Sequence, residues 1–233
     1  MDKEIFLALI EAWGFPVPKG CNVETLFQNG FPAWVETENA FVVKPINEGD
    51  SLGIKIVHGL DRLSSVLNTI PLSDRWRWRL EEFVVGPFGT VAVLDLFGEL
   101  VVGDVVVFDL PQGFEFYDDR LKLHQVEERA APRVLSGHVA TQIAEDAKKL
   151  YRHFHCKGIV RYDFISGQNG HVYLETNTIP GFYPGSNAAT CFEKYVSFED
   201  LMAVTIYAQL AERPSQRGQS VGVWERVKIV FWT

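Results

Sequence analysis

Two alternating segments late in the chain constrain its fold more than any other feature. The segments are GIVRYDFIS (158–166) and HVYLETN (171–177), and the sequence Gly-Gln-Asn-Gly (167–170) fills the short gap between them. Alternating strands separated by such a gap predict a β-hairpin. A three-residue loop, 168–170, with Gly170 in the left-handed conformation is a common way to close one. We therefore expect an antiparallel strand pair here.

The register of this hairpin sorts its side chains onto two faces. Because side chains alternate with a period of two, Asp163 is expected opposite Glu175, and Arg161 opposite Asn177, all on one polar face. The other face is expected to lie in the core and carries Val160, Tyr162, Phe164, Val172 and Leu174.

The polar face suggests a metal site. Two carboxylates directly across a strand pair repel each other unless a cation lies between them. Mg²⁺ prefers oxygen ligands, often one or two carboxylates with phosphates and water. Asp163, Glu175 and the amide oxygen of Asn177 match that preference. The alternative is a solvated face on which Arg161 pairs with Asp163 or Glu175, and the hairpin alone does not decide between the two.

A second group of residues suggests phosphate binding. The segment FVVKPINEGDSLGIKIV (41–57) reads as a strand ending at Lys44, a loop with Gly49 and Gly53, and another strand. Free backbone N–H groups in such a loop can approach phosphate oxygens, with Lys44 and Lys55 as cations. The spacing is not that of a P-loop, and an ordinary hairpin loop is the alternative.

Composition narrows the class of protein. A chain of 233 residues with a formal net charge of -8 argues against a nucleic-acid partner, because such proteins cluster Lys and Arg. No segment is long and apolar enough for a membrane span, and the N-terminus does not read as a signal peptide, so we expect a cytoplasmic protein with no membrane partner. Cys21, Cys156 and Cys191 form no C-x-x-C pair, and we expect them to be reduced.

Further elements follow from local patterns. We expect helices at 3–12, at 61–70 with Asp61 as N-cap, near 137–153, and after the capping-box pattern that starts at Ser197. Strands are expected at 76–85, 90–97 and 99–108, the first with one packed and one solvated face. The stretch from Pro111 to Pro132 has no clear period, and so long a loop is often functional.

Taken together, these segments resemble the ATP-grasp superfamily, and specifically the D-alanine:D-alanine ligase family without its N-terminal domain. MDK resembles the start of the family's central domain. FVVKPINEGDSLGI is similar to its VKP-x-x-EGSS-x-G phosphate loop, and LEEFVVGPFGTVAVL to its E-K-x-x-x-G-x-E-x-T-V hinge. FYDDRLK is similar to its FYDY-x-x-K loop, and CKGIVRYDFI with VYLETNTIPGF to its G-x-x-R-x-D and E-x-N-x-x-PG signature.

The resemblance implies an α+β ATP-grasp fold of two α+β lobes with the nucleotide cleft between them. The smaller lobe, with the phosphate loop, is expected at 1–85, the larger, with the metal and substrate site, at 86–211, and a C-terminal tail at 212–233.

The resemblance also implies a role for each matching residue. ATP would be bound by Lys3, Lys44, Glu48, Gly49, Asp50, Ser51, Glu81 and Val84, the last two at the adenine. Lys122 would reach the γ-phosphate, and Arg161 would stabilise the oxyanion of a tetrahedral intermediate. Asp163, Glu175 and Asn177 would hold Mg²⁺ or Mn²⁺, and Gly181 and Ser186 would lie near the substrate.

The implied reaction is an ATP- and Mg-dependent ligation of an amino acid or peptide through an acyl phosphate. Departures from the family pattern at Asp50 and Leu123, which help to build the substrate side, and above all the absence of the N-terminal domain indicate an altered substrate specificity. Phe88 stands where a Glu usually grips the ribose, so the nucleotide grip is expected to be incomplete or replaced. Two alternatives stay open: a nucleotide-binding pseudoenzyme, and a ligase subunit that depends on a partner. A homodimer or a separate protein would then replace the missing N-terminal domain.

Overall fold

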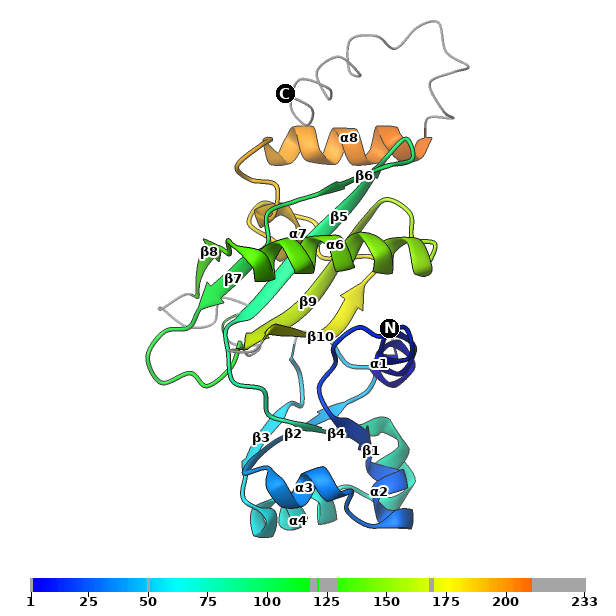
Figure 1. The fold of residues 1–233 in the computed structure, drawn as a ribbon, viewed down its shortest axis with the longest axis vertical. Helices are drawn as coiled ribbons and strands as arrows, with labels where there is room; N and C mark the ends of the chain where they lie inside the picture. Colours follow the sequence, from blue (N-terminus) through cyan, green and yellow to red (C-terminus); the bar gives the residue numbers. More distant parts are fainter. Residues whose placement is uncertain (1, 50, 118–120, 122–129, 168–169, 211–233) are drawn as a thin grey trace, which may run out of the picture. The chain divides into compact units, whose positions relative to one another are not determined.

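The structure, a computed structural model, describes residues 2–49, 51–117, 121, 130–167 and 170–210 (Figure 1). It divides into two compact units, each built from separated stretches of the chain. The first contains the described residues of Met1–Phe88, Phe108–Ala131 and Ile165–Glu175, and the second those of Gly89–Val107, Pro132–Phe164 and Thr176–Thr233. The predicted lobes are continuous in sequence, and their boundaries stay a prediction.

The first unit holds a four-stranded antiparallel sheet in the order β1-β4-β2-β3. Its strands are β1 (Gly20–Asn22), β2 (Ala40–Pro45), β3 (Lys55–His58) and β4 (Trp78–Glu82). Its helices are α1 (Lys3–Ala12), α2 (Val23–Asn29), α3 (Ala33–Thr37), α4 (Leu60–Asn68) and the 3-10 helix η1 (Leu72–Arg77).

This sheet has one apolar and one charged face. The apolar face packs on α2, α3 and α4 in a core of Val23, Leu26, Val35, Phe41, Val43, Val57, Leu63, Leu67, Ile70 and Leu80. Period-two alternation places Lys44, next to Val43, and Arg79 and Glu81, on either side of Leu80, on the opposite face. The sheet alone therefore brings three charged side chains to one surface.

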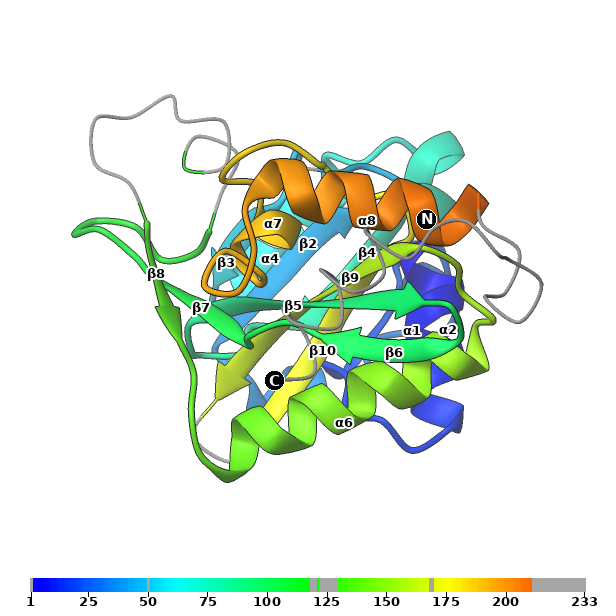
Figure 2. The ribbon, with the colours of Figure 1, turned by 90° about the horizontal axis from the view of Figure 1, so that it is seen from above.

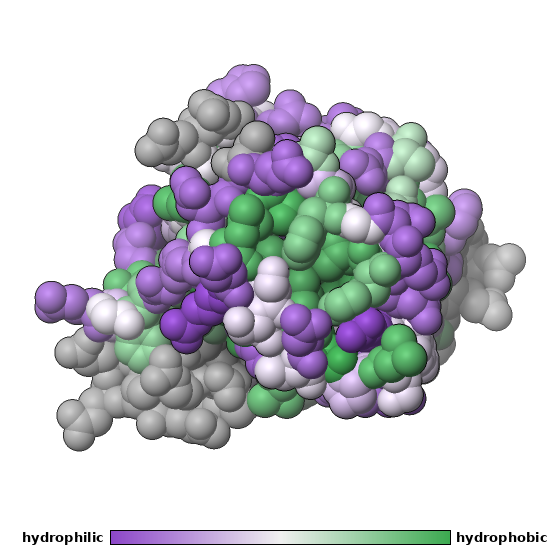
Figure 3. Space-filling model, turned by 90° about the horizontal axis from the view of Figure 1, so that it is seen from below, coloured by the Kyte–Doolittle hydropathy of each residue, from purple (hydrophilic) through white to green (hydrophobic). Residues whose placement is uncertain are grey.

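Apolar side chains also gather on the face of the first unit that Figure 3 shows, over the elements at the lower end of Figure 1, among them α2, α3 and α4. Exposed apolar residues of these elements include Phe27 on α2 and Leu60 on α4. Elsewhere in the first unit, Leu72 of η1 is also exposed.

The second sheet has the order β10-β9-β5-β7-β8, with β6 also paired to β5. Its strands are β5 (Phe88–Leu96), β6 (Glu99–Val102), β7 (Val106–Asp109), β8 (Ala131–Val134), β9 (Ile159–Gly167) and β10 (Gly170–Asn177). The helices of the second unit are α6 (His138–His153), α7 (Asn187–Thr190) and α8 (Phe198–Leu210). Figure 2 shows α6 on one side of β5 and β6 and α8 on the other.

Several predicted elements are confirmed. The helices predicted at 3–12 and 137–153 are α1 and α6, and the predicted hairpin strands are β9 and β10. The N-cap at Ser197 is also confirmed, because its Oγ accepts a hydrogen bond from the backbone N–H of Asp200 at 3.1 Å, and the Asp200 carboxylate accepts from the Ser197 hydroxyl at 2.9 Å. None of the helices in the described ranges combines the length and apolar character that crossing a membrane requires.

The predictions at two element starts are wrong. Helix α4 begins after Gly59, whose φ of 81° suits glycine, so Asp61 lies in the first turn and is not the N-cap. In that first turn the Asp61 carboxylate still interacts favourably with the positive end of the helix dipole. The strand expected at 76–85 is a 3-10 helix up to Arg77 and becomes a strand only at Trp78.

The single strand expected at 99–108 is broken into β6 and β7. Gly103 lies at the break and packs against the backbone of Cys191, where an added Cβ would come within 2.6 Å of the Cys191 carbonyl oxygen. Both pieces still pair with β5, β6 through Val102 and Val93, and β7 through Val106 and Thr90. The N–H of Gly103 still donates to Ala92 of β5 at 3.0 Å, whereas the N–H of Asp104 turns to the carbonyl of Cys191 at 2.7 Å, so the chain leaves β5 after Gly103 and pairs with it again in β7.

The core face predicted for β10 is also wrong. Tyr173 is fully buried, whereas Val172 and Leu174 are only half-buried. The N-terminal segment explains the reversal, because the N–H of Tyr173 donates to the carbonyl of Pro16 at 2.9 Å and its ring meets Phe15 edge-on. Gly170, which was expected in the hairpin loop, is the first residue of β10. Its φ is 135°, a positive value that glycine adopts readily.

Replacing Ser197 by Ala tests the cap of α8. We expect the free energy of unfolding to fall by about 1 kcal/mol, because the Asp200 N–H loses its acceptor. Ser65→Ala is the matched control: its hydroxyl bonds back to the Asp61 carbonyl within α4, and its loss changes stability by less than about 0.5 kcal/mol. Urea denaturation measures both variants, and equal effects would contradict the assigned cap.

Candidate active site

The charged face of the first sheet carries a buried ion network. The Glu81 carboxylate accepts from Lys44 Nζ at 2.7 Å through Oε2 and from Arg79 Nε at 2.8 Å through Oε1. Arg79 also reaches Glu4 of α1 at 2.8 Å. Lys44 is 4% exposed and Glu81 2%, so water stabilises neither charge. Each buried charge in this network is therefore compensated by another side chain.

The register explains why these groups meet. Lys44 lies directly opposite Arg79 in the β2–β4 pair, and Gly20 lies opposite Glu81 in the β1–β4 pair. A Cβ at position 20 would come within 2.7 Å of the Arg79 guanidinium and 2.8 Å of the Glu81 side chain. Burial lowers the pKa of Arg79, but Glu81 and Glu4 more than offset this, and the net pKa is raised. The guanidinium stays charged.

A second cation of this unit is Lys3, at the start of α1. Its ammonium lies 3.3 Å from Oε2 of Glu175 and donates a short hydrogen bond to the carbonyl of Glu48. The N–H of Lys3 also donates to the carbonyl of Ile46 at 3.2 Å. The structure thus joins Lys3 and Glu175, two predicted site residues, to the predicted phosphate loop.

The loop itself is anchored by Ser51. Its hydroxyl donates to the carbonyl of Tyr117 at 3.0 Å, and its φ is 61°, which is uncommon for a non-glycine residue. The Tyr117 ring stacks on Phe88 at 4.8 Å and on Phe108 at 4.9 Å. Phe88 is buried in this aromatic stack. The position where the family resemblance places a ribose-binding Glu is thus apolar and packed.

The second unit contains a cluster around Asp163, which is fully buried. Arg161 donates to both carboxylate oxygens at 2.9 Å. Thr90 Oγ1 donates to Oδ1 at 3.0 Å, and Asn177 Nδ2 to Oδ2 at 3.2 Å. The predicted ion pair of Arg161 with Asp163 is confirmed, but the solvated face of that alternative is wrong for Asp163.

The donor set suits a hard divalent cation. Among the described residues, no group of three or more His, Cys, Asp or Glu side chains is arranged to hold a metal ion. The predicted set, however, takes its third oxygen from an amide, and Asn177 contacts Asp163 through its nitrogen, not through that oxygen. Within the described ranges, four donor groups already hydrogen-bond to Asp163, as many as the carboxylate has lone-pair sites. A cation on Asp163 must therefore replace one of them.

The structure separates the predicted metal ligands between its two units. Glu175 belongs to the first unit, with Lys3, and Asp163 and Asn177 belong to the second. Their joint action stays a prediction.

The predicted substrate residues lie beyond β10. Ser186 caps α7, and its buried Oγ accepts from the N–H groups of Ala189 and Tyr183, both at 3.4 Å. This leaves the hydroxyl hydrogen as the donor that Ser186 can offer. Gly181 is exposed beside the Tyr183 ring. Val84, predicted at the adenine, is half-buried two residues after β4.

Sequence reasoning missed Arg79, Glu4 and Thr90. The solvated face expected for the strand at 76–85 would include Arg79, yet Arg79 is 6% exposed because Glu81 and Glu4 neutralise it. The signal was present, since Arg79 and Glu81 are two residues apart in a strand and so share a face. Asp50, Lys122, Leu123 and the tail at 212–233 lie outside the described residues.

Comparison with known proteins defines the class of protein to which this fold and these two clusters belong. The chain has the ATP-grasp fold of the D-alanine ligases. The family model "D-ala D-ala ligase C-terminus" matches residues 22–207, and the chain belongs to this family.

Three relatives illustrate the similarity. A D-alanine–D-alanine ligase of Chelativorans sp. (strain BNC1) is 31% identical over 193 residues, covering 80% of this chain and 60% of the ligase. The vancomycin/teicoplanin A-type resistance protein VanA of Enterococcus faecium is 33% identical over 156 residues, 63% of this chain and 45% of VanA. The crystal structure of the VanG D-Ala:D-Ser ligase of Enterococcus faecalis aligns with a TM-score of 0.66 at 25% identity, covering 89% of this chain and 61% of VanG. The chain thus spans about 60% of the ligase from Chelativorans.

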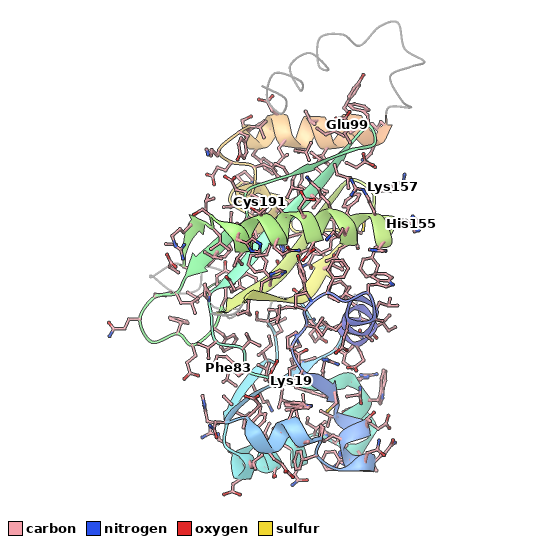
Figure 4. All side chains as sticks on the ribbon, viewed as in Figure 1. Lys19, Phe83, Glu99, His155, Lys157 and Cys191 are labelled. Atoms are coloured by element: carbon pink, nitrogen blue, oxygen red, sulfur yellow. The ribbon has the colours of Figure 1, made fainter. Side chains whose placement is uncertain are left out.

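The thiol of Cys191 gives a testable property of the second unit. It donates to the carbonyl of Thr90 at 3.9 Å, and Cys191 directly follows α7 (Figure 4). Burial raises its pKa from 9.0 to about 12. A raised thiol pKa stabilises the fold below pH 9, and this stability is lost as the pH rises from 9 toward 12.

We therefore expect Cys191 to resist a thiol reagent such as DTNB at pH 8 in the folded protein and to react after denaturation. Mass spectrometry of the labelled protein assigns the modified cysteine. Labelling of Cys191 in the folded protein as fast as in urea would contradict the buried thiol.

Proposed function

We propose that this chain is an ATP-dependent carboxylate-amine ligase that works through an acyl phosphate and requires Mg²⁺ or Mn²⁺. The observation that supports this most is the presence of two buried clusters of charged side chains, one around Lys44 and Glu81 and one around Asp163 and Arg161. Isolated buried charges destabilise a fold, so such clusters are expected where a charged ligand is handled. Membership of the D-ala D-ala ligase C-terminus family supplies the reaction class.

The cations Lys3 and Lys44 would bind the phosphates of ATP. Both are buried, and both lie next to the loop that joins β2 and β3: Lys44 near the end of β2, and Lys3 on the carbonyl of Glu48. Backbone N–H groups from Glu48 to Ser51, including Gly49 and Asp50, would add donors. Glu81 and Val84 would receive the adenine.

Phosphoryl transfer would depend on position and charge. The substrate carboxylate attacks the γ-phosphorus, the bond from that phosphorus to the bridging oxygen of ADP breaks, and an acyl phosphate results. An amine then attacks the acyl carbon and phosphate leaves. Arg161 would stabilise the oxyanion of the second step, and Lys122 the γ-phosphate, without any protein nucleophile.

The donor chemistry of Asp163, Glu175 and Asn177 suits the divalent cation. When bound, the cation would neutralise charge on the transferring phosphates. For the protein's own residues, this requires Asp163 to give up one of its present donors. We infer that Arg161 is the donor that leaves Asp163, because Arg161 would then be available to stabilise the oxyanion of the second step.

The substrates are proposed only by class. Ser186, with a hydroxyl hydrogen to donate, and Gly181 would contact a small amino acid. The printed name of VanG, a D-Ala:D-Ser ligase, gives a second amino acid other than D-alanine, so the family accommodates different acceptors. The named relatives are two ligases and a resistance protein, and none favours the pseudoenzyme alternative. A homodimer or separate partner stays a prediction.

Calorimetric titration with the non-hydrolysable ATP analogue AMP-PNP tests this proposal. We expect binding that strengthens at least about tenfold when Mg²⁺ is present, because the metal links the carboxylates to the phosphates. Absence of binding in both conditions would contradict the proposed function.

Glu175→Gln tests the metal assignment. We expect the fold to persist, shown by an unchanged circular dichroism spectrum, and Mg²⁺-dependent release of phosphate from ATP to fall by about 100-fold or more. Glu145→Gln is the control, since Glu145 pairs with Lys148 on an exposed part of α6. Equal activity in the Glu175 variant and the unmodified protein would rule out Glu175 as a metal ligand.

A further inference from the structure

Arg79 has no part in the proposed reaction, yet it is buried in the phosphate-binding cluster. Glu81 has two carboxylate oxygens, and each is taken by a different cation: Lys44 on Oε2 at 2.7 Å and Arg79 on Oε1 at 2.8 Å. Without Arg79, Lys44 would be the one cation that the described part of the chain places on this carboxylate, which is 2% exposed. Removing a partner from a buried charge is strongly unfavourable.

The pairing of Lys44 with Glu81 limits how Lys44 could bind a phosphate, and this inference rests on the proposed function. Lys44 can turn from Glu81 toward a phosphate only if Glu81 keeps another counter-ion. We propose that Arg79 is a positioning residue of the nucleotide site, which holds Glu81 neutralised and so makes Lys44 available to the triphosphate.

The geometry suits an arginine at this position. The guanidinium bridges two carboxylates at once, with Nε on Glu81 and an Nη on Glu4 of α1, as a single ammonium point charge cannot do as well. Gly20, opposite Glu81, leaves the space that the guanidinium fills. Glu4 is one-third exposed, so Glu81 is the more strongly desolvated of its two partners.

The test compares two ligands that differ in phosphate. Affinities for AMP-PNP with Mg²⁺ and for adenosine are measured by calorimetry in the unmodified protein and in Arg79→Met. We expect Arg79→Met to lower the ratio of AMP-PNP to adenosine affinity by about 10- to 100-fold, because both ligands share any adenine contact with Glu81 and only the triphosphate needs Lys44. Arg77→Met is the control, since Arg77 stacks on Trp76 at 4.8 Å and is absent from the network.

A rescue variant separates positioning from simple damage. In Arg79→Met with Glu81→Gln, the carboxylate that competes for Lys44 is gone. We expect the ratio of AMP-PNP to adenosine affinity to return toward the unmodified value. An unchanged ratio in Arg79→Met, or a loss that the second substitution does not restore, would overturn the role of Arg79.

The unmodified protein provides an independent measurement should Arg79→Met not fold. The Nε–H of Arg79 is followed by ¹H–¹⁵N NMR as AMP-PNP and Mg²⁺ are added. We expect this hydrogen to stay protected from exchange while the Lys44 ammonium signal shifts. Loss of the Arg79 protection, or an unmoved Lys44, would overturn the proposal. A protein that binds no AMP-PNP at all would instead reject the proposed function, on which this inference depends.

Discussion

The charged face of the first sheet depends on one interaction, the pairing of the Glu81 carboxylate with both Lys44 and Arg79. A charge that is 2% exposed is tolerated only with close opposite partners, so the register of β1, β2 and β4 must bring them together. The same alternation that places Val43 and Leu80 in the core places the charged groups on the other face. Packing and site formation are therefore two results of one pattern.

The second unit follows the same rule with different residues. Asp163 is fully buried and receives four hydrogen bonds, two of them from Arg161. Arg161 and Asp163 share a face of β9, two residues apart, as Arg79 and Glu81 share a face of β4. In both units an Arg two residues before an acid neutralises it. Under the proposed function, a phosphate or a metal ion would bind to such a cluster by exchange with partners already present, because the charged groups are already paired.

Local pattern predicted much of this fold. The helix at 3–12, the hairpin strands and the cap at Ser197 depend on periodicity or a short motif, and the structure confirms them. The failures depend on distant contacts. The core face of β10 is decided by Phe15 and Pro16, far away in sequence, and the break at Gly103 by the backbone of Cys191. Arg79 shows both cases: its spacing from Glu81 predicts a shared face, whereas its ion pair with Glu4 joins distant elements and no local pattern indicates it. The joint action of Asp163, Glu175 and Asn177 depends on both units and stays a prediction.

The formation of an acyl phosphate is the central claim, and positional isotope exchange tests it most directly. ATP labelled with ¹⁸O in the β,γ-bridge is incubated with the protein and Mg²⁺. One D-amino acid from a panel is added to each reaction, and no other acceptor is present. Reversible transfer of the γ-phosphate to a substrate carboxylate predicts that the label moves to non-bridging β-positions, and only when a suitable amino acid is present. Bound ATP whose label stays in the bridge with every amino acid in the panel would contradict the proposed ligase chemistry.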